Sequence, residues 1–172
     1  TLFRSAGEMP VVMGAGGSGI LLHEAIGHAF EADFNRKNTS IFSDQLNKKV
    51  CNEHINVVDD GTIPFNRGSV NIDDEGVDGQ KTYIVREGVL TSYLHDRISA
   101  KHYGIPSTGN GRRESFRQMP IPRMRATYME AGNVTEEEII STVKKGIYAA
   151  NFTNGQVQIG AGDFTFFVKD GY

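Results

Sequence analysis

The stretch His23-Glu24-Ala25-Ile26-Gly27-His28 is the most distinctive pattern in this chain, and the local fold has to accommodate it. Two imidazoles flank a carboxylate within an apolar segment, and imidazoles are common zinc ligands. A glutamate beside such a site can accept a proton from water that the metal activates. The pattern indicates metal-dependent hydrolysis, and its alternative is a pair of ordinary histidines on a half-buried helix.

The spacing of the two histidines is the geometric difficulty of this motif. The common metalloprotease pattern, H-E-x-x-H, places its histidines roughly 40° apart around a helix. Here the pattern is H-E-x-x-x-H, and a regular α-helix would separate the two side chains by roughly 140°. A single ion cannot be shared at that angle. We therefore predict that 23–28 is not a regular α-helix throughout, because it contains a π-type turn or because it is broken near Gly27.

Length and composition fit one soluble globular domain. The chain has 172 residues, of which 38% are hydrophobic and 23% charged, enough for one core. Its net charge of −3 gives no electrostatic reason to expect nucleic acid or a membrane as a partner. No apolar run approaches the roughly 20 residues of a membrane span. Cys51 is the single cysteine, which fits the cytoplasm; it is expected to be structural, with a metal ligand as the alternative.

Helix and strand signals do not alternate regularly, which predicts an α+β fold with a largely antiparallel sheet. A motif-bearing helix is expected from 18 to 34, with Ser18 as its N-cap. A second helix is expected near 135–148, where Thr135 and Glu138 form a capping box. Its apolar face would comprise Ile139, Ile140, Val143 and Ile147.

Shorter elements are expected elsewhere. Strand-like runs occupy 10–13, 81–85, 89–94, 156–159 and 163–168. The first of these reads as a buried strand, and the second and third form a hairpin. Asp96 is expected to cap a short helix that reaches Tyr103 and ends at Gly104.

A glycine-rich loop at 108–115 is the second candidate for function. Exposed backbone amides, an asparagine and a guanidinium could hold a peptide chain or a carboxylate. We predict that the substrate-binding residues are Gly109, Asn110, Gly111 and Arg112. The alternative is a surface turn with solvated arginines.

Two acidic residues follow the second histidine. Glu31 and Asp33 could each orient a histidine by a hydrogen bond, as carboxylates beside metal sites commonly do. The alternative is a solvated helix face.

Three ordered segments together resemble the TldD/PmbA family, whose members are described as gyrase modulators and peptide-maturation proteases. They are 21–28 with 31–34, then 58–62, then 108–114. The TldD-type member is a zinc metalloprotease that bears H-E-x-x-x-H, whereas its partner type, PmbA or TldE, lacks this motif. The chain therefore resembles the TldD type.

The resemblance implies that His23 and His28 bind zinc and that Glu24 is the general base of a peptidase acting on unfolded or extended peptides. It also implies a PmbA/TldE-type partner subunit and a downstream cysteine as third ligand, which this chain lacks. Residues 1–172 are then expected to be a single domain. This domain would be a piece of the C-terminal metalloprotease domain of a longer protein, inactive alone. The rival interpretation is a non-catalytic interaction module of a heteromeric complex.

Overall fold

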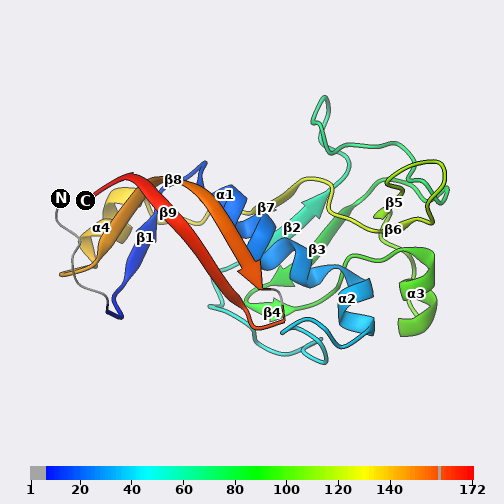
Figure 1. Ribbon diagram of the computed structural model, residues 1–172, viewed down its shortest axis with the longest axis horizontal. Helices are drawn as coiled ribbons and strands as arrows, with labels where there is room; N and C mark the ends of the chain where they lie inside the picture. The colour runs from blue at the N-terminus through cyan, green and yellow to red at the C-terminus, as the bar shows by residue number, and fades with distance from the viewer. Residues whose placement is uncertain (1–6, 159) are drawn as a thin grey trace.

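The computed structural model describes residues 7–158 and 160–172, and it confirms the α+β class. Figure 1 shows a broad part that contains β2, β3, α2 and α3, and a narrower part formed by β1, α4 and a long hairpin of β8 and β9. The described residues form three sheets, in which the only parallel pair joins β1 to β8. The sheet is thus largely antiparallel, as predicted.

The four-stranded sheet supports the candidate site. Its order is β4-β3-β2-β7, and all neighbours are antiparallel. The strands are β2 (Val57–Asp60), β3 (Lys81–Arg86), β4 (Val89–Leu90) and β7 (Thr127–Met129). The predicted hairpin is confirmed: β3 and β4 are joined through Glu87 and Gly88, which both have positive φ.

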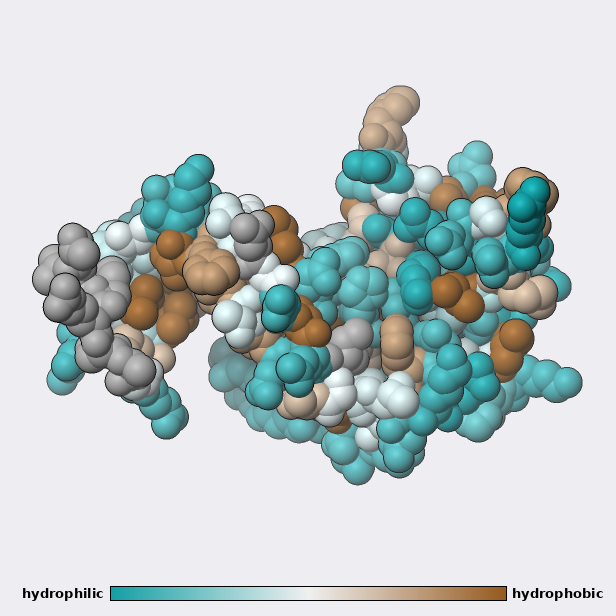
Figure 2. All heavy atoms as spheres, viewed as in Figure 1, coloured by the Kyte–Doolittle hydropathy of each residue, from teal (hydrophilic) through white to brown (hydrophobic). Residues whose placement is uncertain are grey.

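Two smaller sheets flank it. The β1-β8-β9 sheet consists of β1 (Val11–Met13), β8 (Ile147–Gln158) and β9 (Asp163–Gly171), and the two-stranded sheet of β5 (Gly111–Arg112) and β6 (Ile121–Pro122). The prediction of a buried first strand was wrong, since Val11 and Met13 are 45% and 40% exposed. Figure 2 shows apolar side chains gathered on the visible face of the narrower part.

The single helix predicted for 18–34 is divided into four pieces. They are α1 (Ser18–Leu21), the π-helix η1 (Leu22–Gly27), the 3-10 helix η2 (His28–Phe30) and α2 (Ala32–Arg36). The N-cap is Gly17 rather than Ser18. The chain leaves the helical path at Glu31, where ψ is 127°, because the backbones of Phe30 and Ala32 both hydrogen-bond to Leu94.

The other two helices carry their predicted caps. In α3 (Arg97–Tyr103), the Asp96 side chain accepts from the Ser99 amide and Gly104 ends the helix with φ 68°. In α4 (Glu136–Ser141) the capping box is present, but the helix is shorter than predicted. Ile147, assigned above to a helical face, begins β8 because it pairs with Val11 of β1.

The core lies between the helical segments and the four-stranded sheet. Its buried cluster comprises Leu22, Phe30, Ala32, Val57, Ile84, Val85, Leu90, Tyr93, Leu94 and Met124. Cys51 is half-buried and packs against this cluster, which is the structural role expected for it. Among the described residues, no helix has the length and hydrophobicity that crossing a membrane requires.

Candidate active site

The H-E-x-x-x-H motif lies on the π-helix η1, which resolves its spacing problem. The His28 amide donates to the carbonyl of His23, an i→i−5 bond that inserts one extra residue into the turn. The two imidazole rings consequently lie edge to face with centroids 4.9 Å apart. One ligand atom from each of His23, Glu24 and His28 lies within 4.8 Å of the others. The prediction of a π-type turn is confirmed.

Gly27 serves close packing rather than an unusual backbone angle. Its φ of −58° and ψ of −51° are ordinary helical values, so the alternative of a break at this residue is wrong. A Cβ atom here would collide with the sulfur of Met124 and lie 3.0 Å from its terminal methyl. The missing side chain lets Met124, which lies between β6 and β7, pack against the motif.

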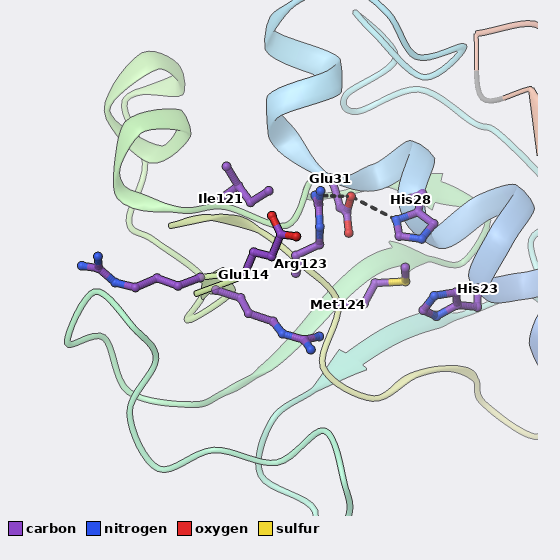
Figure 3. A pocket seen from close by; sticks show the side chains of 9 residues that line it. His23, His28, Glu31, Glu114, Ile121, Arg123 and Met124 are labelled. Atoms are coloured by element: carbon purple, nitrogen blue, oxygen red, sulfur yellow. Dashed lines mark hydrogen bonds and ion pairs between the residues drawn. The ribbon is translucent and has the colours of Figure 1, made fainter. Parts of the chain in front are cut away.

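Glu31 fixes the orientation of the His28 ring by a hydrogen bond. Its buried carboxylate oxygen Oε2 lies 3.1 Å from His28 Nδ1 and accepts a 2.8 Å bond from Arg123 Nη1. Figure 3 shows Glu31 between these two partners. Because a carboxylate accepts, Nδ1 carries the proton and Nε2 is left for a metal. The same bond raises the pKa of His28 above its ordinary value, against the effect of burial. Of the two acidic residues considered, Glu31 takes this role and Asp33 lies on α2.

A pocket of about 570 Å³ opens beside the histidine pair. It is lined by His23, His28, Glu31, Arg112, Arg113, Glu114, Ile121, Arg123 and Met124. Figure 3 shows the two labelled histidines on one side of the helix, with Met124 beside them and Glu114 across the pocket. The helix therefore supplies one wall and the segment 112–124 the other.

Glu24 lines a second, smaller pocket on the other side of the motif. This pocket of about 230 Å³ lies between α1 and the β8–β9 hairpin, with Phe152 and Phe166 in its wall. The Glu24 side chain is exposed. A carboxylate oxygen of Glu24 nevertheless lies within 4.8 Å of a ring nitrogen of each histidine.

The loop at 108–111 is engaged within the protein. The Asn110 side chain is 1% exposed; its amide donates to Asp59 (2.7 Å) and to the carbonyl of Arg123 (3.0 Å). Thr108 donates its hydroxyl proton to the Asn110 side-chain oxygen at 2.7 Å. These bonds place the Arg123 backbone, and through it the guanidinium that binds Glu31.

The two glycines beside Asn110 let the loop lie against an acidic turn. Gly109 has φ 72°, and a Cβ there would collide with the carbonyl of Asp78. A Cβ on Gly111 would lie 2.7 Å from the Glu75 carboxylate, and its amide already donates to Asp73. The loop thus brings Arg112 alone of the four predicted substrate-binding residues into the lining of the large pocket.

Asp59 anchors this arrangement from β2. Its carboxylate also accepts bonds from the Arg125 amide (2.9 Å) and the Thr127 hydroxyl (2.7 Å). Burial raises the pKa of Asp59, whereas these hydrogen bonds and that of Asn110 oppose the rise. Sequence reasoning missed Asp59, Arg123 and Met124 as site residues. The three-segment resemblance contained Asp59, but nothing local linked Arg123 to Glu31, 92 residues away.

The donor set fits a zinc ion in part. Two imidazoles with clustered ligand atoms, one of them oriented by a carboxylate, are the donors that catalytic zinc sites use. Such sites have three protein ligands. Cys51 does not belong to the cluster found among the described residues, so His23 and His28 form an incomplete set.

Comparison with known proteins identifies the family of this chain. Residues 6–172 match the PmbA/TldA metallopeptidase C-terminal domain. The metalloprotease TldD homolog of Buchnera aphidicola (subsp. Acyrthosiphon pisum) is 51% identical over 97% of this chain. The zinc metalloprotease TldD homolog of Saccharolobus solfataricus is 36% identical over 97% of it. The chain spans 35% and 37% of the lengths of these relatives.

The fold agrees with a solved structure as well. TldE from Thermococcus kodakarensis superimposes with a TM-score of 0.80 at 24% sequence identity, over 96% of this chain and 38% of that one. This likeness concerns the fold alone. The sequence matches over nearly the whole chain show that this chain belongs to the PmbA/TldD metallopeptidase family and corresponds to its C-terminal domain.

Proposed function

We propose that this chain is part of a zinc-dependent peptidase that hydrolyses peptide bonds of unfolded or extended peptides. His23 and His28 would bind the metal, and Glu24 would be the general base. The observation that carries the proposal is the π-turn, which gathers the two imidazoles and the Glu24 carboxylate within 4.8 Å. A structural helix has no need for this irregular turn, which occurs mostly at functional sites.

The chain's own residues account for most of the mechanism. Zinc supplies a Lewis acid at the histidine pair when it is bound. Glu24 accepts the proton that water loses as it attacks the scissile carbonyl, and it then returns that proton to the departing amine. Glu31 holds His28 in the tautomer that presents Nε2, and Arg123 balances the charge of the buried Glu31 carboxylate.

The remainder of the site belongs to the rest of a longer protein. Two histidines supply two of the three protein ligands that a catalytic zinc site needs, so the third ligand would come from outside this chain. We propose the TldD type because the motif is intact, a PmbA/TldE-type subunit as partner, and the cytoplasm as location. Residues 1–172 alone are expected to bind zinc weakly and to be inactive.

The rival function is a non-catalytic interaction module, in which the helix only packs against a partner. A pair of variants in the full-length protein distinguishes the peptidase from the interaction module. Glu24→Gln keeps size and hydrogen bonding but cannot act as a base at neutral pH, so it should retain zinc and lose about 10²- to 10⁴-fold in peptidase rate. His23→Ala should lose metal and activity together. Full activity of Glu24→Gln, or absence of zinc from the wild-type protein, would contradict the proposal.

A further inference from the structure

The large pocket contains one cation that has no partner within the described part of the chain. Arg123 is bound to Glu31, and the Arg113 guanidinium donates to the carbonyl of Gln118 at 3.2 Å. The Arg112 side chain makes no hydrogen bond or ion pair with any described residue. It is exposed and lines the same pocket as His23 and His28.

The backbone around Arg112 is nevertheless held firmly. Arg112 pairs with Ile121 across the two short strands β5 and β6. On one side, the Gly111 amide donates to Asp73 at 2.9 Å and the Gly111 carbonyl accepts from Arg125 at 3.0 Å. On the other side, the Arg113 amide donates to Asp74 at 2.8 Å. The Arg112 guanidinium is thus unpaired among the described residues, while the backbone of this residue is fixed. This reduces the conformational entropy that the residue loses when a ligand binds.

The charges of the pocket lining leave a positive excess. The lining contains three arginines and two glutamates, and Arg123 with Glu31 forms an internal pair. Within this lining Arg112 and Arg113 are then opposed by Glu114, while the nearby carboxylates of Asp73 and Asp74 accept from the backbone amides of Gly111 and Arg113. A guanidinium offers paired donors that match the two oxygens of a carboxylate, so this wall favours an anionic group on the bound molecule.

We propose that Arg112 binds a carboxylate of the peptide substrate, supplied by an Asp or Glu side chain or by the C-terminus, beside the histidine pair. The inference rests on the proposed peptidase function and narrows its substrates. The carboxylate would anchor the peptide across the pocket from His23 and His28, which fixes where the scissile bond lies. A peptide is favoured over a nucleic acid because the whole chain has a net charge of −3.

Matched peptides test this proposal in the full-length, zinc-loaded protein. One pair, amidated at the C-terminus, differs by Glu or Gln next to the cleaved bond. A second pair without acidic side chains differs by a free or amidated C-terminus. KM and kcat are measured for each peptide, and Kd is measured by fluorescence anisotropy with the Glu24→Gln protein. The variants are Arg112→Gln and, as matched control, Arg117→Gln, which removes an exposed arginine that stacks on Phe116 outside the pocket.

The wild-type protein should prefer one carboxylate-bearing member about tenfold in Kd and KM, the size of one charge-assisted contact. The pair that shows the preference identifies its source. Arg112→Gln should abolish the preference between the members of that pair, whereas Arg117→Gln should keep it. Equal binding of all peptides, or a preference that survives Arg112→Gln, would overturn the inference. Binding without cleavage by the wild-type protein would count against the peptidase function instead, while Kd would still decide the role of Arg112.

Discussion

The side-chain amide of Asn110 donates a 2.7 Å hydrogen bond to the carboxylate of Asp59, and both residues are 1% exposed. This bond joins segments 51 positions apart in the sequence. A series of further contacts connects this bond to the candidate metal ligand His28. Asn110 holds the backbone of Arg123, Arg123 binds Glu31, and Glu31 binds His28. The three sequence segments that resemble the family are thereby physically linked.

Asn110→Ala should destabilise the full-length protein by about 1–3 kcal/mol, because Asp59 would keep a buried oxygen without its donor. Asp59→Ala should cost more, because the Arg125 amide and the Thr127 hydroxyl also lose their acceptor, and the double variant should cost less than the sum. Urea unfolding followed by circular dichroism measures these changes. Asn133→Ala removes an exposed asparagine and should change stability by less than about 0.5 kcal/mol. Full additivity of Asn110→Ala and Asp59→Ala would mean that the bond contributes nothing.

Gly27→Ala should destabilise the protein by about 1–3 kcal/mol, because the new Cβ would collide with Met124. Since Met124 lines the pocket with both histidines, zinc affinity should fall as well. Gly19→Ala is the matched control: Gly19 lies on α1, and a Cβ added there would meet nothing within 4 Å, so this change should be neutral or stabilising by up to about 1 kcal/mol. If the collision is the cause, Met124→Ala should reduce the cost of Gly27→Ala. Equal effects at positions 19 and 27 would contradict this explanation.

Local signals predicted those features that local geometry determines. The capping box of Thr135 and Glu138, the Asp96 cap and the irregular turn at 23–28 each depend on residues within one or two turns. The spacing predicted an irregular turn, either of π type or broken near Gly27, because a regular α-helix does not bring residues five apart onto one face.

Features set by distant partners were not predictable in the same way. The break at Glu31 arises from backbone bonds to Leu94, and the strand at Ile147 from pairing with β1. Burial of Asn110 depends on Asp59, whereas its glycine neighbours alone suggested an exposed loop. In each case, contacts with a distant segment change the structure that the local sequence favours.

Glu31→Gln should weaken zinc binding about 10- to 100-fold in the full-length protein, because a neutral amide holds the His28 tautomer less firmly. Chelator competition measures the zinc Kd, and the ¹⁵N shifts of His28 report its tautomer independently of activity. Glu53→Gln is the control, since Glu53 is exposed and forms an ion pair with Lys49, away from the histidines. An unchanged zinc Kd for Glu31→Gln would show that His28 does not depend on this carboxylate.

His95 should make the fold sensitive to acid. Its side chain is 1% exposed, it lies among Tyr93, Tyr103 and Asp96, and burial lowers its pKa to about 4. The unfolded chain binds a proton near pH 6.5, whereas the folded protein resists it down to about pH 4. The contribution of His95 to stability is therefore constant above pH 6.5, and it should lower stability by about 3 kcal/mol between pH 6.5 and 4.

His95→Phe removes this proton and keeps a ring of similar shape, so its stability should depend less on pH across that window. Urea unfolding of wild type and variant at half-unit steps from about pH 7.5 to 4 measures the difference, in which titrations common to both proteins cancel. His102→Phe removes an exposed histidine of α3 and should retain the acid sensitivity, because His95 is still present. Parallel stability curves for wild type and His95→Phe would show that the imidazole is not kept neutral by burial in the folded protein.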